Sequence, residues 1–260
     1  MVQFSFTMNE LIYFLLILTR VSCFVFIAPF FSMQNTPARV RIALSVFVSL
    51  LLYQSMPVSE PVEYNTIAGF TLIVIKEALV GLLIGFCTNI CTTIVSFSGA
   101  IADMETGLSM VTLIDPATKQ NTSITGVLYQ YVFMLILIAS GMYRYLLKAL
   151  ADTFVLIPVN GAVFDSEHLL NAMLIFLKDY VMIGFRIVLP IFCVILLLNA
   201  ILGVLAKVSP QMNMFAVGMQ LKVLVGLGVL FLSVGMMPGA ADFIFGEMKK
   251  MIELFVEGMT

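Results

Sequence analysis

Charged residues are scarce in this chain of 260 residues: 13 lysines and arginines and 15 aspartates and glutamates make up 11% of it. Soluble domains average about 25%. The basic residues are scattered and the formal net charge is −2. With no basic patch to neutralise phosphates, we expect no nucleic-acid partner. Hydrophobic residues account for 61% of the chain, which indicates a helical membrane protein.

Residues that commonly carry chemistry are also scarce. The single histidine, His168, lies in a polar break, and no serine-hydrolase, zinc-protease or phosphate-loop motif is present. Each of the four cysteines, Cys23, Cys87, Cys91 and Cys193, lies in an apolar run, without further ligands at metal-binding spacing. We therefore expect no enzyme, no catalytic residue, no cofactor and no metal.

Long apolar stretches alternate with short polar breaks, and two of the stretches are too long for one membrane crossing. Residues 67–101 would form a helix of roughly 52 Å at about 1.5 Å per residue, against a hydrocarbon core of about 30 Å. Residues 169–206 are similarly long and contain Pro190, which kinks or breaks helices. We predict an all-α fold in which these stretches are bent helices or hairpins that pack on protein more than on lipid.

Small residues recur every three or four positions along the first of these long stretches, and so share one helix face. They are Gly81, Gly85, Thr88, Thr92, Ser96, Gly99, Asp103 and Gly107. Such a face lets another helix approach closely. The partner is either a helix of this chain or another subunit, and the length of the stretch favours another subunit.

Several charged residues fall inside apolar segments, where an unpaired charge is unfavourable. These predicted buried charges are Arg20, Lys76, Glu77 and Lys222, together with Asp103 in the small-residue face. Lys76 and Glu77 are adjacent and point about 100° apart on a helix, so they are poor partners for each other. Ion pairs at helix or subunit contacts are the favoured explanation, and a proton or ion relay is the alternative.

An apolar segment with turn signals at both ends follows the small-residue face. Non-helical backbone at membrane depth is tolerated only beside protein or a water-filled passage. The segment is therefore a candidate channel plug, with a buried connecting loop as the alternative. Its residues are Gly107, Leu108, Ser109, Met110, Val111, Thr112, Leu113, Ile114, Asp115 and Pro116.

Residues 245–257 form an amphipathic pattern, with Met248, Met251, Ile252 and Phe255 on one stripe. This stripe is predicted to lie either on a membrane or partner, or on the chain's own helices.

Five blocks of the sequence resemble the FliR family of flagellar biosynthesis proteins and its virulence-secretion counterparts. The resemblance follows the family order over nearly the whole chain. The blocks are Arg20 with Pro29 and Phe30; Pro37 with Arg39 and Arg41; Lys76 and Glu77 with Gly81 and Gly85; residues 99–107 leading to Asp115 and Pro116; and residues 210–218 followed by Lys222.

The resemblance implies a single export-gate subunit, residues 1–260, with a P-like part at about 1–170 and a Q-like part at about 171–260. It implies tilted helical hairpins assembled in a hetero-oligomeric ring with FliP-like and FliQ-like membrane subunits and a FliB/FlhB-type switch subunit. The ring would lie in the bacterial inner (cytoplasmic) membrane, at the flagellar basal body, in contact with membrane lipid, and lifted toward the periplasmic side.

For function, the resemblance implies a channel for exported unfolded flagellar proteins, closed by the plug at residues 107–116 and extending to Thr122. The alternative is an ion-coupled secondary transporter that uses Lys76, Glu77, Asp103 or Lys222 as coupling sites. Transporters commonly contain matching repeats, and this sequence contains no convincing repeat.

Overall fold

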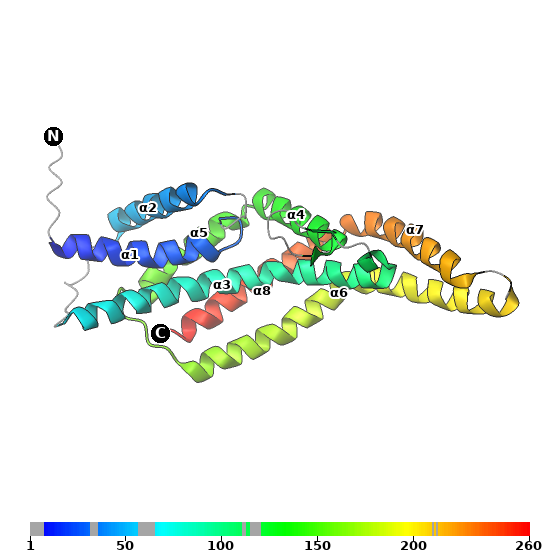
Figure 1. Ribbon diagram of the computed structural model, residues 1–260. Helices are drawn as coiled ribbons and strands as arrows, with labels where there is room; N and C mark the ends of the chain where they lie inside the picture. Colours follow the sequence, from blue (N-terminus) through cyan, green and yellow to red (C-terminus); the bar gives the residue numbers. More distant parts are fainter. Residues whose placement is uncertain are drawn as a thin grey trace. The chain divides into compact units, whose positions relative to one another are not determined.

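The computed structural model describes residues 8–31, 36–56, 66–110, 113–114, 121–209, 211 and 213–260. Within them, the all-α fold predicted from the sequence is confirmed (Figure 1). The helices are α1 Met8–Ile27, α2 Ala38–Ser55, α3 Ile67–Thr106, α4 Ile124–Ala139, α5 Met142–Leu156, α6 Ser166–Val208, α7 Met214–Val234 and α8 Met237–Glu257. A 3-10 turn, η1 Leu108–Met110, and two short strands, β1 Leu113–Ile114 and β2 Asn121–Thr122, lie between α3 and α4.

Both overlong stretches are single helices. α3 has 40 residues and α6 has 43. Pro190 lies inside α6 without ending it, and Figure 1 shows that α6 changes direction near its middle. A proline removes one backbone hydrogen bond and its ring presses on the preceding turn, so a bend is its expected effect.

The chain divides into two compact units that are interleaved in sequence. Unit 1 comprises Met1–Ile90, Gly141–Phe176 and Met248–Thr260, and unit 2 comprises Cys91–Ser140 and Leu177–Glu247. The helices α3, α6 and α8 each contribute to both units. The division into a P-like and a Q-like part near residue 170 stays a prediction.

The core of unit 1 includes the apolar stripe of α8. Met248 and Met251 are fully buried, and Ile252 and Phe255 are 4% and 2% exposed. Of the two predictions for this stripe, the one that it packs on the chain's own helices is therefore confirmed. Burying a side chain of this size contributes about 1.5–3 kcal/mol. The stripe thus holds the end of α8 firmly in unit 1.

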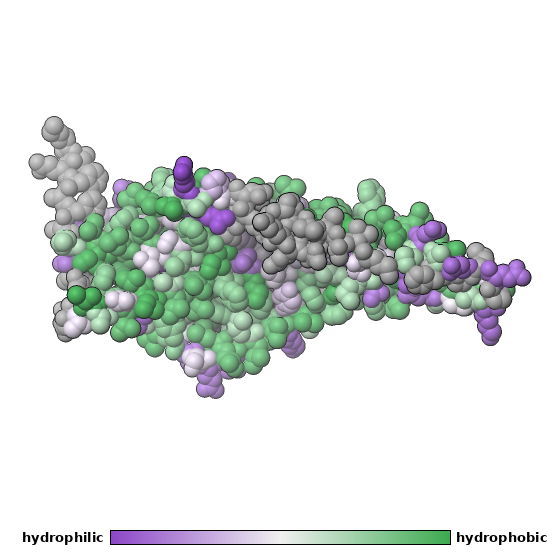
Figure 2. Space-filling view, in the orientation of Figure 1, coloured by the Kyte–Doolittle hydropathy of each residue, from purple (hydrophilic) through white to green (hydrophobic). Residues whose placement is uncertain are grey.

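Much of the surface is apolar. In the described part of the chain, five helices are long and apolar enough to cross a membrane, and the number rises to six if α4 and α5 together form one span. Large hydrophobic side chains on α6, such as Leu197, Ile201 and Val204, are more than half exposed. Figure 2 shows hydrophobic residues over most of the visible face. Apolar patches this extensive require lipid or partner chains around them, as expected for a multi-pass membrane protein.

Candidate functional site

The connection between α3 and α4 contains the predicted plug, and its backbone turns back on itself. Gly107, with φ of +84°, adopts the left-handed conformation that commonly ends a helix. After η1, β1 pairs antiparallel with β2, so that Leu113 lies opposite Thr122. The turn signals of the sequence indicated a break here but did not reveal this pairing.

The predicted plug is only partly covered by the described residues. Leu108 is half-buried and Ser109 is exposed. Val111, Thr112, Asp115 and Pro116 lie outside the described residues. The backbone of Met110 belongs to η1, and the backbones of Leu113 and Ile114 form β1.

Asp103, in the last turn of α3, ties this helix to the start of α4. Its side chain is 1% exposed. The Thr125 backbone N–H donates to both carboxylate oxygens, at 3.3 and 3.2 Å, and the Thr125 hydroxyl donates to Oδ1. Among the described residues Asp103 has no ion pair. Hydrogen bonds from a helix terminus satisfy this carboxylate, and an ion pair of Asp103 stays a prediction.

Two groups cap the start of α4, where the first N–H groups have no partner within the helix. Ser123 is the N-cap, and its hydroxyl accepts from the Gly126 N–H at 2.9 Å. Asp103 supplies a second acceptor from α3, and its negative charge suits a helix N-terminus. These two acceptors fix both ends of the connection at its base, an arrangement that we call the Asp103 clamp.

Close backbone contact reinforces the Asp103 clamp. A Cβ atom at Gly99 would overlap the backbone of Gly126, so α3 and α4 touch there. On the neighbouring side, the Ser98 hydroxyl donates to the Gly184 carbonyl of α6 at 3.1 Å. Thr92 is also buried and Ser96 is half-buried. The base of the connection therefore rests on a packed layer of helices in unit 2.

The small-residue face continues in unit 1, where it contacts α1. A Cβ atom at Gly81 would overlap the carbonyl oxygen of Arg20, and one at Gly85 would lie 3.2 Å from Ile27 Cβ. At Gly81, Gly85 and Gly99 the partners are thus helices of this chain, and the favoured prediction of other subunits is wrong for these three positions. For the rest of the face it stays a prediction. Periodicity identified the face, but it contains no information on which distant segment covers it.

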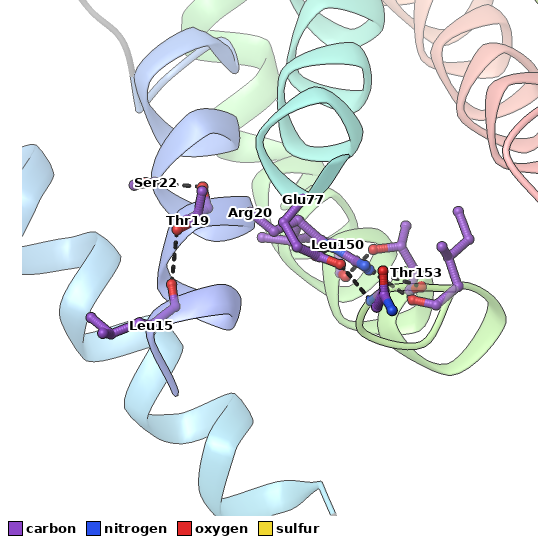
Figure 3. A network of polar contacts seen from close by, with 9 residues as sticks. Leu15, Thr19, Arg20, Ser22, Glu77, Leu150 and Thr153 are labelled. Atoms are coloured by element: carbon purple, nitrogen blue, oxygen red, sulfur yellow. Dashed lines mark hydrogen bonds and ion pairs between the residues drawn. The ribbon is translucent and has the colours of Figure 1, made fainter. Parts of the chain in front are cut away.

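Arg20 and Glu77 form a fully buried ion pair between α1 and α3 (Figure 3). Arg20 Nε donates to Glu77 Oε2 at 2.6 Å. The other carboxylate oxygen accepts from the Asn160 N–H at 2.9 Å. Both oxygens of Glu77 are therefore occupied. One of them binds α1 and the other binds the turn that follows α5.

The Arg20 guanidinium also caps the end of α5. Its Nη1 donates to the carbonyl oxygens of Thr153 and Ile157, at 3.3 and 2.9 Å. It lies over the Phe154 ring, 4.2 Å from the centroid. Terminal carbonyls of a helix lack partners and carry partial negative charge, so a buried cation is well placed there. Arg20 thereby joins three helices of unit 1.

Lys76 and Lys222 are half-buried in this chain, and their burial at subunit contacts stays a prediction. In the described part of the chain neither forms an ion pair. Lys76 points about 100° away from Glu77 around α3, and long lysine stems let the ammonium group reach the surface. Within the described ranges, no three His, Cys, Asp or Glu side chains gather as a metal site.

Comparisons with known proteins agree with the resemblance drawn from the sequence. The model of the bacterial export proteins, family 1, matches residues 11–248, a range that includes every candidate site residue. The chain is 26% identical over 234 residues to the flagellar biosynthetic protein FliR of Escherichia coli, covering 88% of this chain and 87% of that protein. It is 26% identical over 248 residues to FliR of Bacillus subtilis, covering 95% and 92%. It is 28% identical over 250 residues to FliR of Aquifex aeolicus, covering 95% of each.

Proposed function

Because this chain belongs to family 1 of the bacterial export proteins, we propose that it is a non-enzymatic subunit of the flagellar type III export gate. It is a multi-pass membrane component of the flagellar export apparatus. In the proposal it assembles with FliP-like and FliQ-like subunits, and with a FliB/FlhB-type switch subunit, in the bacterial inner membrane. The assembled helices surround a channel for unfolded flagellar proteins.

In this proposal the α3–α4 connection is the plug of the channel. The observation that carries it is the Asp103 clamp: a segment with an apolar sequence is fixed at its base by three hydrogen bonds to one buried carboxylate. A hydrogen bond to a charged group contributes about 1.5–3 kcal/mol. Such a base holds the two ends of the connection together at α3 and α4.

The mechanism requires no chemistry from this chain. At rest, the apolar plug excludes water and ions from the channel. An exported chain displaces the plug, while the Asp103 clamp keeps both of its ends at the channel wall. When the exported chain has passed, the plug returns. A methionine side chain suits this cycle because it is flexible and adapts to irregular spaces. Energy for export comes from an associated ATPase or the proton gradient.

The test is ion leakage through the assembled, reconstituted gate. Deleting residues 108–114 should raise the leak severalfold, because the apolar barrier is removed. Asp103→Ala should raise it less, because the plug is present but its base is loosened. Asp242→Ala is the matched control, since Asp242 is an exposed aspartate on α8.

Co-purification of the partner subunits with each variant establishes that the gate is intact. If the deletion prevents assembly, replacing Leu108, Leu113 and Ile114 with serine keeps the length of the segment and tests the same barrier. A leak equal to that of the unaltered gate, in an intact assembly, would refute the plug.

The transporter alternative gains no support from the arrangement of the charged groups. Both oxygens of Glu77 are occupied by Arg20 and Asn160, and both oxygens of Asp103 accept from Thr125. Carboxylates held in this way are poor sites for a coupling ion that must bind and leave. Family membership also favours protein export.

A further inference from the structure

Arg186 has no role in the proposed plug, yet it is one of the residues that line a mainly apolar cavity in unit 2. The cavity has a volume of about 240 Å³. Its wall comes from α4, α6, α8 and the end of α7, and includes Tyr129, Ile183, Met236, Met237 and Phe243. A cationic side chain beside an apolar cavity is unusual on the surface of a membrane helix.

The Arg186 guanidinium is exposed and oriented. It lies over the Phe243 ring, with Cζ 4.1 Å from the centroid. Among the described residues it forms no ion pair, and Asp242, which precedes Phe243, does not supply one. The guanidinium therefore offers several donors to an anion from outside the chain.

The surroundings of Arg186 are apolar. On α6, Met182, Phe185 and Leu189 are all exposed by more than half. An arginine within such a face is unfavourable in hydrocarbon unless an anion or water reaches it. The anion that is abundant beside exposed apolar helices in a membrane is the phosphate of a lipid headgroup.

The interior of the cavity favours hydrocarbon. Its polar groups are already satisfied, because the Tyr129 hydroxyl bonds to Ser233 Oγ at 2.8 Å and Ser233 Oγ donates to the Leu230 carbonyl at 2.8 Å. The rest of the wall is mainly isoleucine, methionine and phenylalanine. At about 240 Å³ it is smaller than typical small-molecule sites of about 300–1,000 Å³, so it admits part of one acyl chain.

We propose that this cavity and Arg186 form a binding site for an anionic phospholipid. The headgroup phosphate accepts hydrogen bonds from the guanidinium, which forms bidentate pairs with phosphate oxygens, and one acyl chain enters the cavity. A single lipid molecule supplies both the anion and the hydrocarbon. The site is independent of the plug, because it uses none of the residues of the α3–α4 connection.

The proposal is tested by native mass spectrometry of the assembled complex released from detergent, with either phosphatidylglycerol or phosphatidylcholine added. Phosphatidylglycerol should be retained at least tenfold better than phosphatidylcholine by the unaltered chain, and Arg186→Gln should remove this preference. Arg144→Gln is the control, since Arg144 is an exposed arginine that stacks on its own neighbour Tyr143. It should leave the preference unchanged.

Two further arms identify the source of the anion and the role of the cavity. Inorganic phosphate at millimolar concentration should not displace the lipid, because it lacks the acyl chain. Ile183→Trp should fill the cavity and weaken lipid retention with Arg186 present.

Equal retention of phosphatidylglycerol by Arg186→Gln and the unaltered chain would overturn the proposal. So would cross-linking of position 186 to an acidic side chain of another subunit. Ion leakage through the Arg186→Gln gate should equal that of the unaltered gate, so a failed plug and a failed lipid site give different results.

Discussion

Removing the negative charge of the buried ion pair tests how unit 1 is held together. In Glu77→Gln the Arg20 guanidinium stays at the same place, fully buried, but loses its counter-charge. The glutamine amide also offers one acceptor where Glu77 offers two, so either Arg20 Nε or the Asn160 N–H loses its partner. Removing one partner of a buried ion pair lowers the free energy of unfolding by about 3–5 kcal/mol. For a chain of this size, this corresponds to a fall in Tm of roughly 6–20 °C.

Two buried thiols provide the assay. Cys87 and Cys91 lie on α3, the helix that carries Glu77, and are fully buried, whereas Cys193 is exposed. Cys23, on α1, is half-buried. A dye that fluoresces on reaction with thiols therefore reports the unfolding of α3 once both Cys23 and Cys193 have been replaced by serine. The measurement is made in detergent on the complex that co-purifies, with the partner subunits' cysteines replaced. The midpoint of the fluorescence rise on heating is the Tm.

Lys76→Gln is the matched control for Glu77→Gln, because Lys76 is adjacent on α3, half-buried and without an ion pair among the described residues. It should change stability by less than about 0.5 kcal/mol. The double variant Arg20→Met with Glu77→Met should recover part of the loss, since it leaves no uncompensated buried charge. A Tm for Glu77→Gln equal to that of the Lys76→Gln control would refute the reasoning.

Two smaller perturbations use the same thiol assay. Gly81→Ala places a Cβ atom against the backbone of Arg20, and should lower stability by about 1–3 kcal/mol through overpacking. Gly228→Ala is the control, because its Cβ atom meets nothing within 4 Å, and it should not lower the Tm. An equal fall in Tm for Gly81→Ala and Gly228→Ala would show that close packing is not the cause. Ser123→Ala removes the cap from the Gly126 N–H and should lower stability by about 0.5–2 kcal/mol; an unchanged Tm would contradict the capping role.

The Arg20–Glu77 pair and the Asp103 clamp use the same physical device. In both, a charged side chain from a long apolar helix binds backbone groups at the end of a neighbouring helix. Helix ends expose unpaired N–H or C=O groups, which are especially unfavourable where water is absent. Each buried charge thereby satisfies groups at a helix end and obtains partners from them, although Arg20 Nη2 has no hydrogen-bond partner among the described residues. The device accounts for Arg20 and Asp103 inside apolar helices.

Composition and local pattern by themselves determined the class of this protein. Apolar runs with few charges specify membrane helices, and small residues three or four positions apart specify a face for close packing. Both are properties of neighbouring residues along one helix, so they can be seen without knowledge of the fold. The order of the motif blocks was enough to identify the family, and the match over residues 11–248 confirms that resemblance.

Only the tertiary structure decided which groups meet. Arg20 binds Glu77, which is 57 positions away in the sequence. Asp103 binds Thr125, which is 22 positions away and on the far side of a chain reversal. Gly81 and Gly85 of α3 proved to be covered by α1, and Gly99 by α4, of the same chain. Periodicity describes one helix face but not its partner, because the partner is selected by long-range packing and by the need to satisfy buried helix ends. That selection is made only when the segments fold together.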